Sequence, residues 1–259
     1  MLPVPDPQDL MAGMLVFLRI SMLMMLLPVI GHKLVPTPVK TGFVGILTFV
    51  LFPVVSSHVP VIPVDPVIFA LLALQEMLLA AALALIAQLI FTAAQFAGQV
   101  MSLQMGMAMA NIFDPATSVQ SAVVGSFVGI LAMLMWLAAG AHHMFILTLA
   151  DSFTLLPPGS AWSFQGWEVI NNAAAAMFIL SIKLMAPVLL LLFFMYVALG
   201  LIARAVPQIQ VFFVSFPLSV GLGLLIFSLA LPAFMALMLD GFVGLGQSLP
   251  IFLRQLAGG

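Results

Sequence analysis

Long apolar runs dominate the chain, and short segments rich in proline, glycine and polar residues separate them. A helix needs roughly 20 apolar residues to cross a hydrocarbon core about 30 Å thick. Runs that approach or exceed this length cover residues 10–30, 41–55, 67–105, 119–150, 168–205 and 211–239. The pattern predicts an all-α fold of membrane-associated helical hairpins with about six apolar helical segments.

Two of these segments are too long for a simple crossing. Residues 67–105 and 168–205 would form helices of roughly 58 and 57 Å, almost twice the hydrocarbon thickness. Either the helices break, for instance at Gly98 or Pro187, or they project beyond the bilayer and bury apolar surface against other subunits. The second alternative predicts an obligate complex.

Composition supports a membrane class and excludes several functions. Hydrophobic residues make up 64% of the 259 residues, and the few charged side chains give a net charge of −2. Six scattered basic residues form no patch for nucleic acid, so lipid and apolar protein are the expected partners. Cysteine is absent, and neither a phosphate loop, a nucleophile elbow nor paired carboxylates occur. His142-His143 lack a third ligand at metal-binding spacing. We expect no catalytic residue, cofactor or metal, and no enzyme.

Charge placement predicts the orientation of the chain. The N-terminal segment carries Asp6 and Asp9 in place of a basic region, so the first apolar run is expected to be retained. Lys33, Lys40 and Arg204 follow the first and fifth runs, and the positive-inside bias then places the N-terminus outside the cytoplasm.

Three charges lie deep inside apolar runs, those of Arg19, Glu76 and Lys183. Arg19 and Glu76 stand nine residues into the first and third runs, and a charge in mid-membrane costs about 2.5–3.5 kcal/mol. A structural ion pair is expected, and a proton or ion relay is the alternative.

The third run also carries a polar stripe at helical spacing. Its members, Gln88, Thr92, Gln95, Gln99 and Ser102, stay within about 40° of one line on a helix. Such a stripe serves either hydrogen bonding between helices or a water-lined path.

Methionine clusters at 22–25 and 133–135, and again at 101–109, shortly before Asp114-Pro115. In this stretch glycine and alanine alternate with Met105, Met107 and Met109. Methionine is either ordinary apolar filler or a soft seal that adapts to different partners.

The chain resembles the flagellar biosynthetic protein FliR family and its injectisome relatives in type III secretion. The residues that carry the resemblance are Leu103-Gln104-Met105-Gly106, Phe113-Asp114-Pro115, Gly140 with His142, Leu156-Pro157 with Gly159, and the run 186–223. Within that run, Pro207, Gln208 and Gln210 followed by Phe216-Pro217 resemble the helical hairpin of the small FliQ partner.

The resemblance implies a FliP-like part at 1–167 and a FliQ-like hairpin with a C-terminal tail at 168–259. It implies a pore-forming export-gate subunit in the bacterial inner membrane and flagellar basal body. Its partners would be FliP-like and FliQ-like subunits, FlhB-like and FlhA-like components, and unfolded proteins in transit. The loop 106–118 would plug the pore, with Met105, Gly106, Met107, Met109, Phe113, Asp114 and Pro115 as the plug residues.

The glutamines of the hairpin, Gln208 and Gln210, either line the cytoplasmic entrance or hydrogen-bond within a turn. A stand-alone secondary transporter, or a channel subunit for small solutes, is the alternative function, although no internal repeat is evident.

Overall fold

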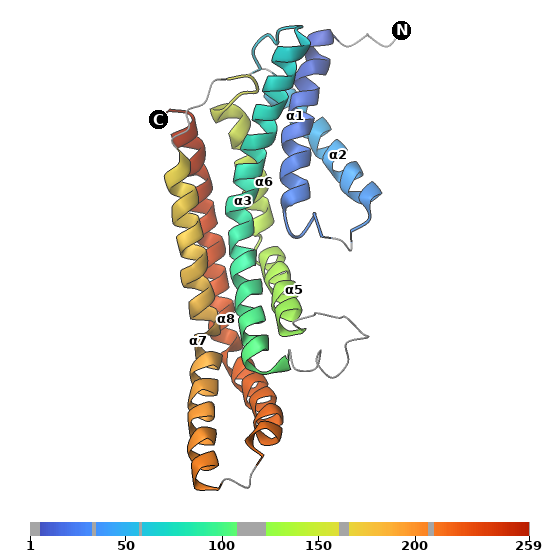
Figure 1. The fold of residues 1–259 in the computed structure, drawn as a ribbon. Helices are drawn as coiled ribbons and strands as arrows, with labels where there is room; N and C mark the ends of the chain where they lie inside the picture. The colour runs from blue at the N-terminus through green and yellow to red at the C-terminus, as the bar shows by residue number, and fades with distance from the viewer. Residues whose placement is uncertain are drawn as a thin grey trace. The chain divides into compact units, whose positions relative to one another are not determined.

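Helices make up the regular structure of the chain (Figure 1). The computed structural model describes residues 6–32, 35–56, 59–107, 123–160, 166–206 and 210–258, and no strand occurs among them. The helices are α1 (Pro7–Leu26), α2 (Thr37–Val55), α3 (Pro66–Gln104), α5 (Val123–Ala138), α6 (Ala141–Leu155), α7 (Trp167–Ala205) and α8 (Val211–Leu256). Among these residues the all-α fold class is confirmed, and five helices are long and apolar enough to cross a membrane, or six if α5 and α6 count as one broken span.

Three helices exceed the length of a bilayer crossing. Helices α3 and α7 have 39 residues each and continue through Gly98 and Pro187, so neither breaks at those positions. Helix α8 has 46 residues and continues to Leu256, whereas the sequence predicted its end at 239. The prediction was wrong because Asp240 and several glycines interrupt the apolar pattern there. Burial at helical spacing nevertheless continues, at Leu245, Leu249, Phe252 and Leu256.

The fourth apolar run, predicted as one segment, forms two helices. Helix α5 ends at Ala138 and α6 begins at Ala141, with Gly140 between them at a φ of +67°. This left-handed conformation is open to glycine at little cost and ends the regular hydrogen bonding of α5. Apolar residues continue on both sides of the break, so hydrophobicity alone gave no sign of it.

The chain folds into two compact units. One unit contains Met1–Leu89, Gly140–Ala174 and Val243–Gly259, and the other contains Ile90–Ala139 and Ala175–Phe242. Helices α3, α7 and α8 contribute residues to both units. We call the first the terminal unit, since it holds both chain ends, and the second the central unit.

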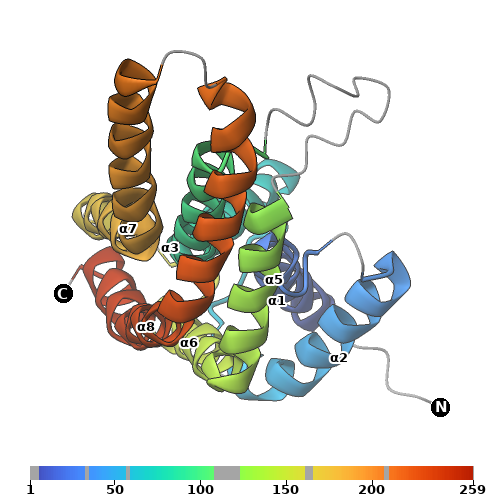
Figure 2. The same ribbon diagram turned by 90° about the horizontal axis from the view of Figure 1, so that it is seen from below.

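In the terminal unit, α1 and α2 lie side by side (Figures 1 and 2). The Asp6 side chain accepts a hydrogen bond from the backbone N–H of Gln8 and caps the start of α1. The Gln8 side chain in turn exchanges two hydrogen bonds with the backbone of Ile62, at 3.0 and 3.1 Å. These bonds fix α1 to the segment that leads into α3, and Leu15 and Ile62 are buried in a common apolar cluster.

In the central unit, small residues let α3 and α5 approach closely. A β-carbon added at Gly98 would lie only 2.7 Å from the Cα of Gly125. Aromatic rings fill the neighbouring space, with Phe91 against both Trp136 and Phe242 at ring-centroid distances of 6.1 and 5.7 Å. This packing holds the second half of α3, which ends beside parts of α7 and α8.

Candidate functional site: a buried ion pair and the end of α3

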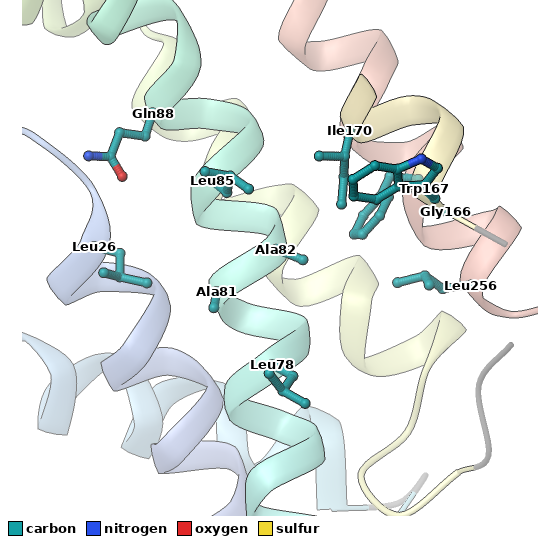
Figure 3. A pocket seen from close by; sticks show the side chains of 11 residues that line it. Leu26, Leu78, Ala81, Ala82, Leu85, Gln88, Gly166, Trp167, Ile170 and Leu256 are labelled. Atoms are coloured by element: carbon teal, nitrogen blue, oxygen red, sulfur yellow. The ribbon is translucent and has the colours of Figure 1, made fainter. Parts of the chain in front are cut away.

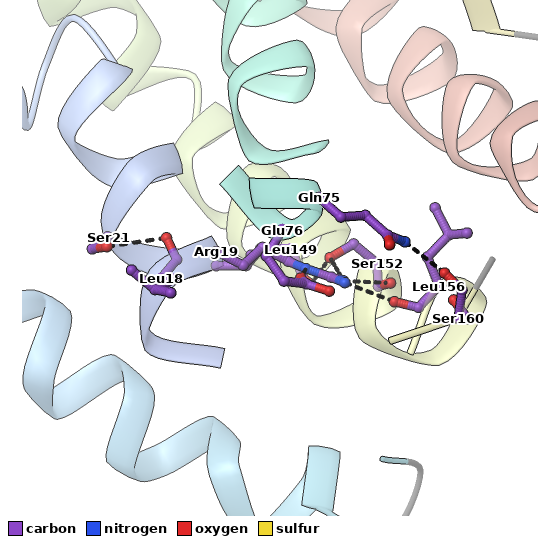
Figure 4. Close-up of polar contacts among 9 residues, drawn as sticks. All are labelled: Leu18, Arg19, Ser21, Gln75, Glu76, Leu149, Ser152, Leu156 and Ser160. Carbon is purple, nitrogen blue, oxygen red and sulfur yellow. Dashed lines mark hydrogen bonds and ion pairs between the residues drawn. The ribbon is translucent and has the colours of Figure 1, made fainter. Parts of the chain in front are cut away.

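The terminal unit contains a buried ion pair (Figure 4). The Nε of Arg19 lies 2.5 Å from the Oε2 of Glu76, and the two side chains are 1% and 2% exposed. The guanidinium also lies over the ring of Phe153, with its central carbon 4.4 Å from the ring centroid. The two charges that the sequence expected to face each other therefore meet, although they are 57 positions apart.

Arg19 also binds the C-terminal end of α6. It donates hydrogen bonds to the carbonyl oxygens of Ser152 at 2.9 Å and Leu156 at 2.8 Å, and to the hydroxyl of Ser152 at 3.3 Å. Carbonyl groups at a helix C-terminus carry partial negative charge, and that of Ser152 also accepts from the backbone N–H of Leu156 at 3.0 Å. One guanidinium thus joins α1, α3 and α6.

The polar stripe of α3 is in several different environments. Gln88 and Gln99 are exposed, Thr92 and Gln95 are half-buried, and Ser102 is buried. Gln95 lies against α5, since a β-carbon added at Gly129 would be 3.3 Å from its Cγ. This contact between helices agrees with the packing interpretation at that position.

An apolar cavity of about 520 Å³ lies in the terminal unit (Figure 3). Helix α3 supplies one wall with Leu78, Ala81, Ala82, Leu85 and Gln88, while Trp167 and Ile170 of α7 face it. Among its lining side chains only Gln88 and Trp167 carry polar atoms. The lining offers no set of converging polar groups of the kind that orients a polar solute.

The central unit brings the predicted plug and hairpin residues together at the end of α3. We call this the α3-end cluster; it consists of Gln104, Met105, Gly106, Tyr196, Phe216, Ser219 and Gly223. Both overall views show the green end of α3 next to the orange parts of α7 and α8 (Figures 1 and 2). Residues of the first plug positions and of the hairpin, which the sequence treated as separate sites, are therefore in contact.

Two side-chain hydroxyls bind carbonyl groups where α3 ends, those of its last residue, Gln104, and of the next residue, Met105. The hydroxyl of Tyr196, on α7, donates to the carbonyl oxygen of Gln104 at 2.8 Å. The hydroxyl of Ser219, on α8, donates to the carbonyl oxygen of Met105 at 2.9 Å. These carbonyl groups lie beyond the last intrahelical amide, so side chains from distant parts of the chain satisfy them.

Glycine is required at two positions of the cluster. Gly106 has a φ of +79° and its N–H donates to the carbonyl oxygen of Leu103 at 2.9 Å, which is a glycine stop at a helix C-terminus. At Gly223, an added β-carbon would lie 2.6 Å from the Cγ of Met105. The fully buried Met105 side chain therefore occupies space left free by the missing side chain of Gly223.

The remaining predicted site residues are described only in part. Met107 is half-buried, and the Ser102 hydroxyl lies 3.6 Å from its sulfur. Gln210 and Phe216 are exposed, as is Pro217. Outside the described residues lie Met109, Phe113, Asp114 and Pro115 of the predicted plug and Pro207 and Gln208 of the hairpin turn.

The sequence missed three residues of the cluster. Tyr196, Ser219 and Gly223 stand 92 to 118 positions from the α3 residues that they contact, and no local pattern points to them. One signal was present, because Tyr196 is the single tyrosine in a chain with 22 phenylalanines. A lone hydroxyl on an otherwise apolar aromatic set indicates a specific hydrogen-bond partner.

The long apolar helices are those of a helical membrane protein. The family of bacterial export proteins, family 1, matches residues 10–245. Flagellar biosynthetic protein FliR of Bacillus subtilis (strain 168) is 36% identical, over 81% of this chain and 82% of the relative. FliR of Pectobacterium carotovorum subsp. carotovorum is 33% identical, and FliR of Escherichia coli (strain K12) is 32% identical, each over 83% of this chain and 82% of the relative.

The chain therefore belongs to the FliR family of bacterial export proteins. Membership makes it a membrane component of the flagellar export apparatus. The relatives are named for flagellar biosynthesis and not as enzymes, which is consistent with a non-enzymatic role.

Proposed function

We propose that the protein is a pore-forming subunit of the flagellar export gate, assembled with FliP-like and FliQ-like subunits in the inner membrane. In this proposal, unfolded flagellar proteins leave the cytoplasm through the assembled pore. FlhA-like and FlhB-like components are the proposed neighbours of the gate. The observation that carries the proposal is the large apolar surface that α7 and α8 leave uncovered.

That surface is uncovered along helices that exceed a bilayer crossing. Phe194 on α7 is 66% exposed, and Phe213 on α8 is 69% exposed. In the most apolar 18-residue stretch of each helix, 28% is buried in α7 and 22% in α8, whereas 50% is buried in α3. A bilayer covers roughly 20 residues of a helix, so 39 and 46 residues need additional apolar cover, which neighbouring subunits supply.

Residues 106–118 are the proposed plug of the closed pore. Support comes from the α3-end cluster, in which Met105 and Gly106, where this stretch begins, contact residues of α8. Tyr196 of α7 binds the carbonyl oxygen of the preceding residue, Gln104. Methionine side chains are flexible and polarizable, so they seal against varied surfaces more readily than stiff β-branched side chains do. The proposed division into a FliP-like part at 1–167 and a FliQ-like hairpin at 168–259 puts the plug in the first part.

Ion leakage tests the plug. Deletion of 106–114, or replacement of Met105, Met107 and Met109 by glycine, should leave assembly intact and raise the small-ion conductance of the cell membrane. Normal conductance in cells with assembled variant complexes would remove the plug proposal.

Co-purification tests the assembly. The protein extracted in mild detergent should bring FliP-like and FliQ-like chains with it, identified by mass determination. A stand-alone transporter would instead be well behaved without partners. The apolar lining of the cavity between α3 and the start of α7 gives that alternative no support, because a solute site needs converging polar groups.

Two further parts of the proposal concern the cytoplasmic side. In this proposal Gln208 and Gln210 either line the entrance or hydrogen-bond within the turn, and the N-terminus faces away from the cytoplasm. Replacement of both glutamines by leucine should reduce export while assembly is retained. Loss of assembly together with export would instead indicate a role in the turn.

A further inference from the structure

We propose that Lys183 on α7 and Asp240 on α8 are the charged contact points through which the protein binds a partner subunit. The partner is an apolar helical hairpin of another membrane chain, with an acidic side chain opposite Lys183 and a basic side chain opposite Asp240. This inference rests on the proposed assembly of the protein into an export gate. Its structural basis lies in described residues of the central unit.

Lys183 and Asp240 are isolated charges in two long apolar helices. Lys183 is the only charged residue of α7 between Glu168 and Arg204, and Asp240 is the only one of α8 before Arg254. Both side chains are exposed. Within the described part of the chain, neither forms an ion pair or a side-chain hydrogen bond. Both charges are therefore available to a group on another molecule.

Both side chains point away from the interior of the central unit. Burial recurs at helical spacing, at Leu184, Val188 and Leu192 in α7 and at Phe234, Met238 and Phe242 in α8. At 100° per residue, Lys183 lies about 140° and Asp240 about 160° around its helix from the mean direction of these positions. Exposed apolar side chains adjoin them, Ile179 and Ile182 beside Lys183 and Leu239 beside Asp240. Each charge thus stands within an uncovered apolar face.

Lipid alone is a poor cover for the face around Lys183. A bilayer hides about 20 residues of a helix, and the uncharged stretch 184–203 of α7 has this length. If lipid covers 184–203, Ile179 and Ile182 lie outside the hydrocarbon and expose an apolar patch to water. If the hydrocarbon extends over Lys183, it surrounds an isolated ammonium group, which is strongly unfavourable. A partner helix with a carboxylate removes the cost in both placements.

The two charges lie at one level of the antiparallel helices. A β-carbon added at Gly241 would lie 3.5 Å from the Cδ2 of Leu180, so these two positions are neighbours across α7 and α8. Toward the hairpin turn, Lys183 is three residues from Leu180 and Asp240 is one residue from Gly241. At 1.5 Å per residue the two charges differ in level by about 3 Å. One partner hairpin can therefore meet both.

Complementary charges supply what an apolar face lacks, which is a defined register. Apolar helices pack in several registers at similar free energy, and a single polar position in such an interface selects one of them. A positive and a negative contact at one level also select the orientation of the partner, because the reversed orientation brings like charges together. The pair Lys183 and Asp240 thus specifies which chain docks and how.

Carbodiimide coupling tests the contact of Lys183 in the unaltered protein, purified together with its partner chains. The reagent joins an amine to a carboxylate in contact with it through an amide bond, and takes up the water that is lost. Mass determination of peptides should find Lys183 joined to an aspartate or glutamate of another chain. A link to Asp240, or a Lys183 without a link to another chain, would overturn the proposal.

Lys183→Arg is the matched control for the coupling. Arginine keeps the positive charge but has no amine that forms the amide bond. The variant should therefore lose the link and retain the partner chains. Loss of the partner chains as well would show that positive charge is not what position 183 contributes, and would overturn the proposal.

Exchange of the two charges distinguishes contacts with a partner from a pair within the chain. Lys183→Asp and Asp240→Lys should each weaken the binding of partner chains about 30-fold or more, measured by dissociation of the complex on dilution. The double variant should bind more weakly than either single variant, because both contacts then join like charges. Recovery in the double variant would show that the two residues pair with each other, and would overturn the proposal.

Glu168→Lys is the control for charge reversal, since Glu168 is exposed at the first turn of the same helix. Its binding of partner chains should change less than about 3-fold. A loss equal to that of Lys183→Asp would show that any reversed charge weakens the complex. If no partner chain co-purifies with the unaltered protein, the proposed assembly fails and the contact points fail with it. If partner chains co-purify and Lys183 is not linked to them, this inference alone fails.

Discussion

Replacement of Glu76 by glutamine removes the charge that balances Arg19 and leaves the side-chain volume almost unchanged. Arg19 is 1% exposed, so water cannot hydrate the guanidinium in place of the carboxylate. Its hydrogen bonds to the carbonyl groups of Ser152 and Leu156 remain, but these groups are dipoles and not full charges. A broken buried pair of this kind costs about 3–5 kcal/mol.

The assay is the temperature of heat-induced aggregation of the full-length protein in detergent extracts of membranes. At about 2–4 °C per kcal/mol for a chain of this size, Glu76→Gln should lower the midpoint by roughly 6–20 °C. The matched control is Glu168→Gln, since Glu168 is the other glutamate of the chain and is exposed at the start of α7. Loss of an exposed acid near a helix N-terminus costs about 0.3–1 kcal/mol, or less than about 4 °C.

A double variant distinguishes a missing charge partner from a general loss of packing. Arg19→Met/Glu76→Leu removes both charges, and Ser152 keeps the N–H of Leu156 as donor to its carbonyl oxygen. The carbonyl group of Leu156 loses its donor from Arg19, at a cost of about 1–3 kcal/mol. The double variant should therefore be more stable than Glu76→Gln alone. A midpoint for Glu76→Gln equal to that of Glu168→Gln would refute the reasoning.

Three further predictions follow from backbone geometry and from the ion pair, all measured by the same aggregation midpoint. Gly98→Ala should destabilise the protein by about 1–3 kcal/mol because the new methyl group meets the backbone of α5. Its control, Gly200→Ala, has open space around the new methyl group and should be neutral or stabilising by about 0.5–1 kcal/mol. Equal midpoints of the two variants would contradict the close approach of α3 and α5. Gly140→Ala forces alanine into a left-handed conformation and should cost about 1–2 kcal/mol, so an unchanged midpoint would contradict the break between α5 and α6. Exchange of the two charges, Arg19→Glu with Glu76→Arg, should restore only part of the stability, since glutamate at position 19 would face carbonyl oxygens at the end of α6; complete recovery would show that those carbonyl contacts contribute nothing.

The sequence predicted the helical fold, the membrane class and the family, because hydrophobic periodicity and a set of ordered motifs carry that information. It missed the break between α5 and α6, and it ended α8 at 239 and not at Leu256. Gly98 and Gly140 look alike in an apolar run, yet one stays in a continuous helix and the other has a positive φ. Tertiary packing makes this difference, since Gly98 lies against α5 and Gly140 begins a new helix.

The sequence predicted contacts between distant residues only where a buried charge requires a partner. Arg19 and Glu76 were paired on the sequence because an isolated charge in an apolar helix is costly. The further partners of Arg19 are the carbonyl groups of Ser152 and Leu156. The sequence could not predict these contacts, because every residue has a backbone carbonyl group. The same holds for Tyr196 and Ser219, whose acceptors are the backbone carbonyl groups of Gln104 and Met105.

The central claim is that other protein chains cover the apolar surface that these long helices expose. The chain has no cysteine, so a single cysteine can carry a photoreactive group at one chosen position. Phe194→Cys places it on the uncovered face of α7, and Leu192→Cys, at a buried position of the same helix, is the control. We predict that illumination of intact membranes cross-links position 194 to other export proteins in high yield, and position 192 only within the chain. Adducts of position 194 with lipid alone, on a protein that exports normally and migrates as a 27.6 kDa monomer, would contradict the account.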